Sequence, residues 1–154
     1  MAEALKHVYS PQLISELATA IQNSHNSFNS QTFCKDVFNA QWDTLELKAR
    51  MSHIRSCIHK HLALPYPQAI QALWEPVKTL GGFEGMLFPE YIQSYGLEDW
   101  DTSLPALAHF TQYSSSEFAV RPFIEQNSKR MMAQMQKWAN HNNKHIRRLA
   151  SEGC

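Results

Sequence analysis

Two glutamates near the end of this 154-residue chain stand where they could take part in chemistry. Each stands near arginines: Glu117 precedes Arg121, and Glu152 follows Arg147 and Arg148. Both stretches have the character of short helices. A carboxylate that is held by its neighbours and points into a groove can act on a substrate. We therefore expect any catalytic site to lie in this part of the chain.

Both glutamates also have structural interpretations. Ser114 and Glu117 have the S-x-x-E spacing of a capping box, in which the glutamate bonds back to the backbone N–H of the cap. Glu152 lies in the last turn of a predicted helix, where a negative charge is mildly unfavourable, and it could simply pair with Arg148. Arg147 and Arg148 could contact phosphates, although a solvated helix face would carry the same residues.

The charged residues are unevenly distributed, although the formal net charge is zero. Residues 1–120 hold 7 Lys and Arg against 12 Asp and Glu, whereas residues 121–154 hold 7 against 2. A basic segment of this kind can face a polyanion even in a neutral protein. On charge alone, a solvated helical face is the alternative.

The composition indicates one globular domain. A chain of this length buries a sizeable core, and no apolar run approaches the roughly 18 residues that a membrane span needs. The N-terminus lacks the order of a signal peptide. The three cysteines, Cys34, Cys57 and Cys154, are odd in number and far apart. This pattern favours free thiols in a reducing cytoplasm, where we expect the protein to be located.

No cofactor and no metal ion are expected. The chain has no CxxC pair, and the histidine pairs His59 with His61 and His141 with His145 have no third ligand nearby in sequence. The glycine-rich loop at 81–87 lacks the pattern of a phosphate-binding P-loop. No Ser-His-Asp arrangement is recognisable.

The apolar residues recur with helical spacing throughout the chain. Ser10 followed by Pro11 predicts a helix start, because a hydroxyl can cap the helix and proline is tolerated in its first turn. Pro76 is expected to kink or split a helix. A third helix is expected to start at Asp43 or Thr44, and it is the clearest amphipathic one. Its apolar face comprises Leu47, Met51, Ile54, Ile58 and Leu62.

The same spacing predicts where several further side chains lie. Arg50 is expected on the polar face of that amphipathic helix. Asp101 or Thr102 is expected to cap one later helix, and Asn127 or Ser128 another. A methionine-rich stripe is interpreted as core packing; it comprises Met131, Met132, Met135 and Trp138.

A weak repeat with a spacing of 28 residues is visible in the second half of the chain. In both copies a helix ends in an aromatic residue, a Ser- or Asn-rich turn follows, and a second helix begins. Paired helices that repeat in this way predict an all-α fold of the α-solenoid type, with an irregular helical bundle as the alternative. The aligned residues are Leu107, Phe110 and Phe118 in the first copy and Met135, Trp138 and Ile146 in the second.

Two long motifs, at 111–123 and 138–153, closely resemble the bacterial DNA alkylation repair proteins of the AlkC branch. The segments 45–50 and 95–97 also resemble that branch, so the likeness runs along nearly the whole chain. The branch consists of 3-methyladenine DNA glycosylases built from HEAT-like repeats, and it is related to the AlkD branch.

The resemblance implies an α-solenoid of HEAT-like helical pairs, a right-handed superhelix whose concave face holds alkylated double-stranded DNA. It implies hydrolysis of the N-glycosidic bond of cationic bases such as 3-methyladenine and 3-methylcytosine. Little general-acid help is needed, because a methylated base that is already cationic is a good leaving group. As the bond breaks, positive charge moves onto the deoxyribose, and nearby carboxylates can stabilise this oxocarbenium-like state.

The roles of individual residues are carried over from the matching motif positions. Glu117 and Glu152 are the implied catalytic residues. Arg121, Arg147 and Arg148 are the implied DNA-binding residues, which hold the DNA backbone or fix the carboxylates.

The chain departs from the family in its length, because the family continues beyond the second motif with further repeats and another catalytic aspartate. We therefore expect residues 1–154 to form a single helical-repeat domain that is the N-terminal portion of a longer one. A truncated C-terminal end would expose apolar surface and favour self-association. The alternative function is a non-catalytic helical-repeat module that binds DNA or protein.

Overall fold

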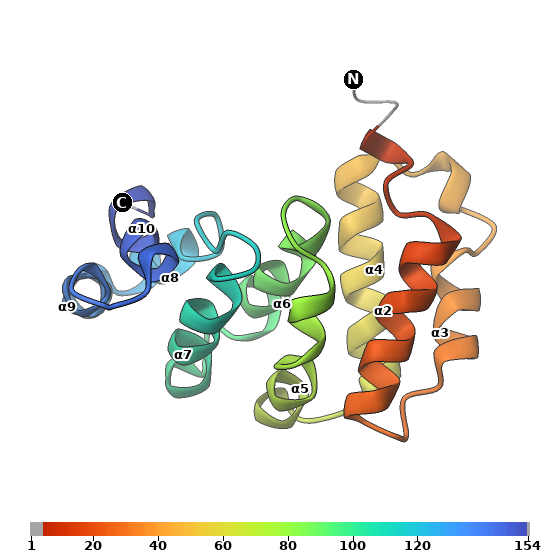
Figure 1. Cartoon of the computed structure of the whole chain (residues 1–154), viewed down its shortest axis with the longest axis horizontal. Coiled ribbons are helices and arrows are strands. Elements are labelled where there is room, and N and C mark those ends of the chain that lie inside the picture. The colour runs from red at the N-terminus through yellow and green to blue at the C-terminus, as the bar shows by residue number, and fades with distance from the viewer. Residues whose placement is uncertain (1–4, 154) are drawn as a thin grey trace. The chain divides into compact units, whose positions relative to one another are not determined.

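The computed structural model describes residues 5–153, and every regular element within that range is an α-helix or a 3-10 helix. The prediction of an all-α fold is confirmed, and neighbouring helices pack in the paired manner of an α-solenoid (Figure 1). The chain divides into two compact units, one ending at Leu80 and the other beginning at Gly81. A single helical-repeat domain over 1–154 stays a prediction.

In the first unit, helix α2 packs against α3 and α5, and α3 packs against α4. The interior is formed by the apolar faces that the spacing predicts, including Ile14, Ile54 and Ile58, which are fully buried. The elements of this unit are α2 (Pro11–Ser24), α3 (Ser30–Val37), η1 (Trp42–Thr44), α4 (Leu47–Leu62), α5 (Tyr66–Leu73) and η2 (Pro76–Thr79).

Two predicted boundaries in this unit are confirmed and one is wrong. The side chain of Ser10 accepts a hydrogen bond from the backbone N–H of Leu13 and caps α2. Pro76 splits its segment, since α5 ends before it and a 3-10 turn follows. The third helix does not start at Asp43 or Thr44, because these residues form the separate turn η1 and α4 begins four residues after Asp43.

Arg50 does not lie on the exposed polar face of α4, as was predicted. It is buried, with an exposed fraction of only 3%. Its Nη1 donates to the carbonyl oxygen of Lys6 at 2.9 Å, and its Nη2 donates to the carbonyl oxygen of Trp42 at 3.1 Å. The guanidinium also lies 4.4 Å from the centroid of the Trp42 ring. Backbone carbonyls and an aromatic face thus replace water around the charge.

In the second unit, α6 packs on α7, α8 on α9, and α10 on both α7 and α9. Gly96 follows α6, and the predicted cap of α9 is confirmed, because the side chain of Asn127 accepts from the backbone N–H of Arg130. The elements are η3 (Glu84–Met86), α6 (Leu87–Tyr95), α7 (Trp100–Thr111), α8 (Arg121–Gln126), α9 (Ser128–Ala139) and α10 (Lys144–Glu152).

Three predictions in this unit are wrong. The cap of α7 is Asp99 rather than Asp101 or Thr102, because the Asp99 carboxylate accepts from the backbone N–H of Thr102, the third residue of the helix. Met132 is 43% exposed, so it lies outside the core stripe of α9. Phe118 is 51% exposed, and so it does not share the buried position of its aligned partner Ile146.

None of the helices in the described part of the chain is long and apolar enough to cross a membrane.

Candidate functional site

The turn between α7 and α8 is fixed to the core through Ser116. This residue is fully buried, and its hydroxyl donates to the carbonyl oxygen of Leu107 at 3.0 Å. Its backbone N–H donates to the hydroxyl oxygen of Thr111 at 3.2 Å. Two groups of one residue are thus bonded to the preceding helix, so the residues that follow it start from a rigid point.

Glu117 lies in this turn and not in a helix, and the capping box is wrong. Ser114 does not cap a helix, because its hydroxyl donates to the carbonyl oxygen of Gly82. The backbone N–H of Glu117 donates instead to the hydroxyl oxygen of Ser115 at 3.1 Å, which is a local serine turn. The Glu117 carboxylate is therefore not needed for helix capping.

The Glu117 carboxylate faces the first residue of α8. Its Oε1 lies 3.6 Å from Nη2 of Arg121, and the side chain of Glu117 remains 32% exposed. The same guanidinium lies 4.7 Å from the centroid of the Phe118 ring. Arg121 therefore contacts both a carboxylate and an aromatic ring.

The second motif forms α10, which begins at a well-defined cap. The side-chain oxygen of Asn143 accepts from the backbone N–H groups of His145 and Ile146. Its amide nitrogen donates to Oε1 of Gln112 at 3.1 Å. One asparagine thus starts α10 and bonds it to the residue that follows α7.

The two arginines of this motif have different surroundings. Arg148 donates from Nε to Oε1 of Glu152 at 2.9 Å. Arg147 instead donates from Nη1 to the carbonyl oxygens of His141 and Asn142, at 2.9 and 2.8 Å. Arg148 therefore holds a carboxylate, whereas Arg147 fastens the loop before its own helix.

A pocket of about 170 Å³ opens between the start of the serine turn and α10. From α10, the side chains of Arg148 and Glu152 line it together with His145. The opposite wall is formed by residues 111–115, with Gly82 at its edge. Glu117 and Arg121 are not among its lining residues, so the structure places one of the two predicted carboxylates in this pocket and the other outside it.

Gly153 brings the two motifs into contact. A Cβ atom built on this residue would lie 2.7 Å from Cγ2 of Val120, 2.8 Å from the carbonyl oxygen of Leu149 and 3.0 Å from Cε of Met135. Only glycine fits here, because the backbone that follows Glu152 packs directly on the residue that precedes Arg121. Sequence spacing gives no signal for Gly153 or Ser116, although both occur inside the motifs.

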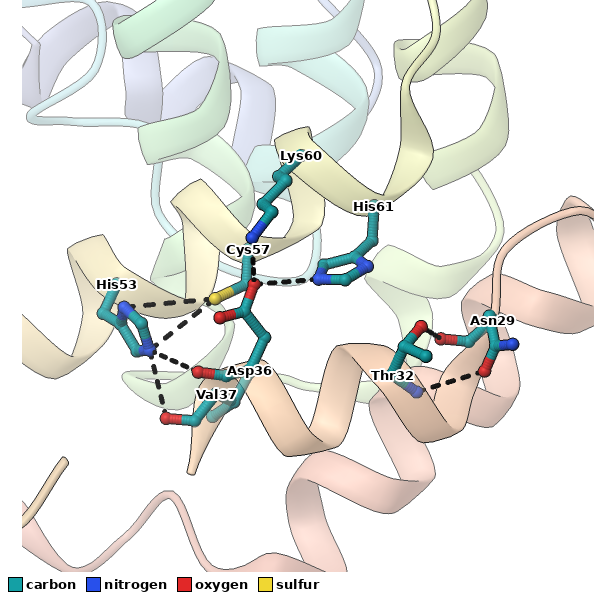
Figure 2. Close-up of polar contacts among 8 residues, drawn as sticks. All are labelled: Asn29, Thr32, Asp36, Val37, His53, Cys57, Lys60 and His61. Carbon is teal, nitrogen blue, oxygen red and sulfur yellow. Dashed lines mark hydrogen bonds and ion pairs between the residues drawn. The ribbon is translucent and has the colours of Figure 1, made fainter. Parts of the chain in front are cut away.

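A second group of titratable side chains, which could in principle take part in catalysis, lies in the first unit and has a structural role (Figure 2). His53 Nε2 lies 3.0 Å from the carbonyl oxygens of both Asp36 and Val37, at the end of α3. The nearby Cys57 is buried, and burial together with the Asp36 charge raises the pKa of its thiol to about 12. A nucleophilic cysteine needs a lowered pKa, so this pair is not an activated Cys-His site.

No group of three or more metal-ligating side chains occurs in the part of the chain that the structure describes.

The geometry can be set beside known proteins. No protein-family model matches the sequence. The solved structure of a Pseudomonas fluorescens alkylpurine DNA glycosylase, AlkC, bound to DNA containing an abasic site analogue, matches with a TM-score of 0.89 and 33% identity over 97% of this chain. The resemblance to the AlkC branch is confirmed. This chain is also 41% identical over 149 residues to the uncharacterized protein YhaZ of Bacillus subtilis strain 168.

Both of these proteins are longer than this chain. It spans 42% of the length of each, while the matched region covers 97% of its own residues. Both candidate glutamates and the three arginines lie within the described residues.

Proposed function

We propose that this chain acts in DNA alkylation repair, as the part of an AlkC-like DNA glycosylase that carries two of its carboxylates. The observation that carries the proposal is a structural match at a TM-score of 0.89 to a DNA-bound alkylpurine DNA glycosylase, in a chain where Gly153 joins the Glu152 motif to the Glu117 motif. The proposed reaction is hydrolysis of the N-glycosidic bond of a cationic base such as 3-methyladenine or 3-methylcytosine.

The proposed role of Glu117 and Glu152 is electrostatic. When the N-glycosidic bond breaks, the deoxyribose gains positive charge, and a carboxylate already in place stabilises it without rearranging. Each carboxylate is partly exposed, at 32% for Glu117 and 39% for Glu152, so each remains accessible to a ligand. Their arginine partners limit the directions in which the carboxylates can point.

The DNA backbone is the proposed partner of the basic segment. Of the three arginines, Arg148 lines the pocket, where it lies beside the Glu152 carboxylate. Arg121 is the equivalent partner of Glu117. Arg147 is proposed to act more through the loop that it fastens than through direct contact with phosphate.

A non-catalytic DNA-binding module is the second candidate, and the basic residues from 121 onwards support it. In this case the chain would bind DNA through the same surface without releasing a base. Self-association and a cytoplasmic location remain predictions.

The two candidates are separated by a base-release assay on duplex DNA carrying 3-methyladenine. Release above the spontaneous rate supports the glycosylase, and Glu117→Gln and Glu152→Gln should each lower it at least tenfold while helicity stays constant. Binding without release supports the module. If neither binding nor release is found for the folded chain, the proposed function is wrong.

A further inference from the structure

Phe118 is the most exposed large apolar side chain in the part of the second unit that the structure describes, at 51%. Its neighbours are not exposed: Ser116, Ala119 and Val120 are all buried. The backbone around it is fixed, because the N–H of Val120 donates to the carbonyl oxygen of Ser116 at 3.1 Å. The ring is thus held out from a rigid turn instead of lying on a loose loop.

One partner of the ring is already present. The guanidinium of Arg121 lies 4.7 Å from the ring centroid, within the range of a cation–π contact. The same guanidinium lies 3.6 Å from the Glu117 carboxylate. Arg121 therefore fixes the orientation of the ring relative to the carboxylate, and the ring is still half exposed.

We infer that Phe118 is a DNA-contacting residue, which stacks against a nucleobase that is unstacked at the lesion. The inference rests on the proposed function and adds a contact to it. Proteins hold unpaired nucleobases by stacking them on aromatic rings, because every base has a π-face, and a nearby arginine adds cation–π attraction. The ring would hold the strand while the neighbouring Glu117 faces the deoxyribose.

A protein partner fits this surface less well than a base does. Stable protein interfaces bury about 800 Å² on each side and centre on a cluster of apolar residues. At Phe118 the apolar surface is a single ring between two charged side chains, Glu117 and Arg121. The residues from 121 onwards are strongly basic, which favours a polyanion as the partner.

The test measures the affinity of this chain for duplex DNA with an abasic-site analogue opposite 2-aminopurine. Phe118→Ala should weaken binding roughly tenfold, the loss expected from one base-stacking contact. It should also remove the change in 2-aminopurine fluorescence that the wild type causes. Phe118→Trp should restore both, and Phe118→Leu, which keeps apolar volume, should not.

Met132→Ala is the matched control, since Met132 is 43% exposed on α9. It should bind like the wild type. If the wild type binds DNA and Phe118→Ala binds equally well, or if Phe118→Leu retains the fluorescence change, the inference is wrong while the proposed function stands. If the wild type does not bind, both fail. A change in sedimentation mass in Phe118→Ala without a change in DNA affinity would instead identify a second copy as the partner, and would also overturn the inference.

Discussion

Gly153 packs against Val120 so closely that a single added methyl group would overlap with it. The Cβ of an alanine at position 153 would lie 2.7 Å from Cγ2 of Val120 and 2.8 Å from the carbonyl oxygen of Leu149. The backbone of Gly153 itself has an ordinary conformation, with φ of −72°. The glycine is therefore required by close approach and not by backbone strain.

Gly153→Ala should lower the free energy of unfolding by about 1–3 kcal/mol, the usual cost of overpacking a filled site. Urea unfolding measures the change. Adding Val120→Ala should recover only part of the loss, because the Leu149 carbonyl oxygen stays in place. Gly81→Ala is the control, since its Cβ would meet only the Tyr113 carbonyl oxygen at 3.6 Å. Equal stability of the Gly153 variant and the wild type would contradict the close approach.

Two adjacent serines should respond differently to substitution. Ser116→Ala removes a fully buried hydroxyl that donates to the Leu107 carbonyl oxygen, and should cost about 1 kcal/mol or more. Ser115→Ala removes an exposed hydroxyl that accepts from the Glu117 N–H, and should cost less than about 0.5 kcal/mol. Thermal unfolding of both variants checks the order, and the reverse order would refute the anchoring role of Ser116.

Substitutions of the two arginines of α10 should affect stability and DNA binding differently. Arg147→Gln should lower the free energy of unfolding by about 1 kcal/mol, because it loses two bonds to loop carbonyls. Arg148→Gln should leave stability nearly unchanged, since its partner Glu152 is exposed. In DNA binding, we expect the larger loss of affinity for Arg148→Gln. Binding titrations at two salt concentrations check this, and a larger loss for the Arg147 variant would contradict it.

Asp36 should make the first unit sensitive to acid (Figure 2). A hydrogen bond from His61 and a second from Lys60 hold the pKa of this carboxyl below its ordinary value of 3.8. A lowered folded pKa adds stability above the unfolded pKa, and this stability is lost as the pH falls through the folded pKa. Asp36→Asn should therefore be less stable than the wild type by about 0.5–1 kcal/mol at pH 7.

The difference between Asp36→Asn and the wild type should shrink as the pH falls below 3.8, and urea midpoints across that range measure it. Asp43→Asn, a change at an exposed aspartate, is the control and should show no such trend. A constant difference between the Asp36 variant and the wild type would count against the ion pairs as its source.

Some local signals in the sequence predicted helix ends correctly. Ser10 with Pro11, and Asn127, act within one helical turn of themselves, and each marks a helix start that the structure confirms. Other local signals failed, at Asp43 or Thr44 and at Asp101 or Thr102. Two further failures have distant partners. Ser114 bonds to Gly82, 32 residues away, and Arg50 reaches the Lys6 carbonyl oxygen, 44 residues away. No spacing rule contains such partners, so the capping box and the exposed position of Arg50 were wrong for the same reason.

The candidate site was predicted by its motifs and not by its geometry. Periodicity alone made Phe118 a counterpart of Ile146, but one is half exposed and the other is buried. A turn places Phe118, whereas a capped helix places Ile146, and the sequence spacing does not distinguish these two environments.

The pairing of Gly82 with the end of α7 has a consequence for the order of folding. The Gly82 N–H donates to the Tyr113 carbonyl oxygen, and the Gly82 carbonyl oxygen accepts from the Ser114 hydroxyl. Each helix of the second unit is closed by bonds between near neighbours, but this edge of the pocket requires two segments about thirty residues apart to meet. Loop-closure entropy opposes that meeting until the intervening helices have formed. We therefore expect the pocket to be assembled late, after the scaffold that surrounds it.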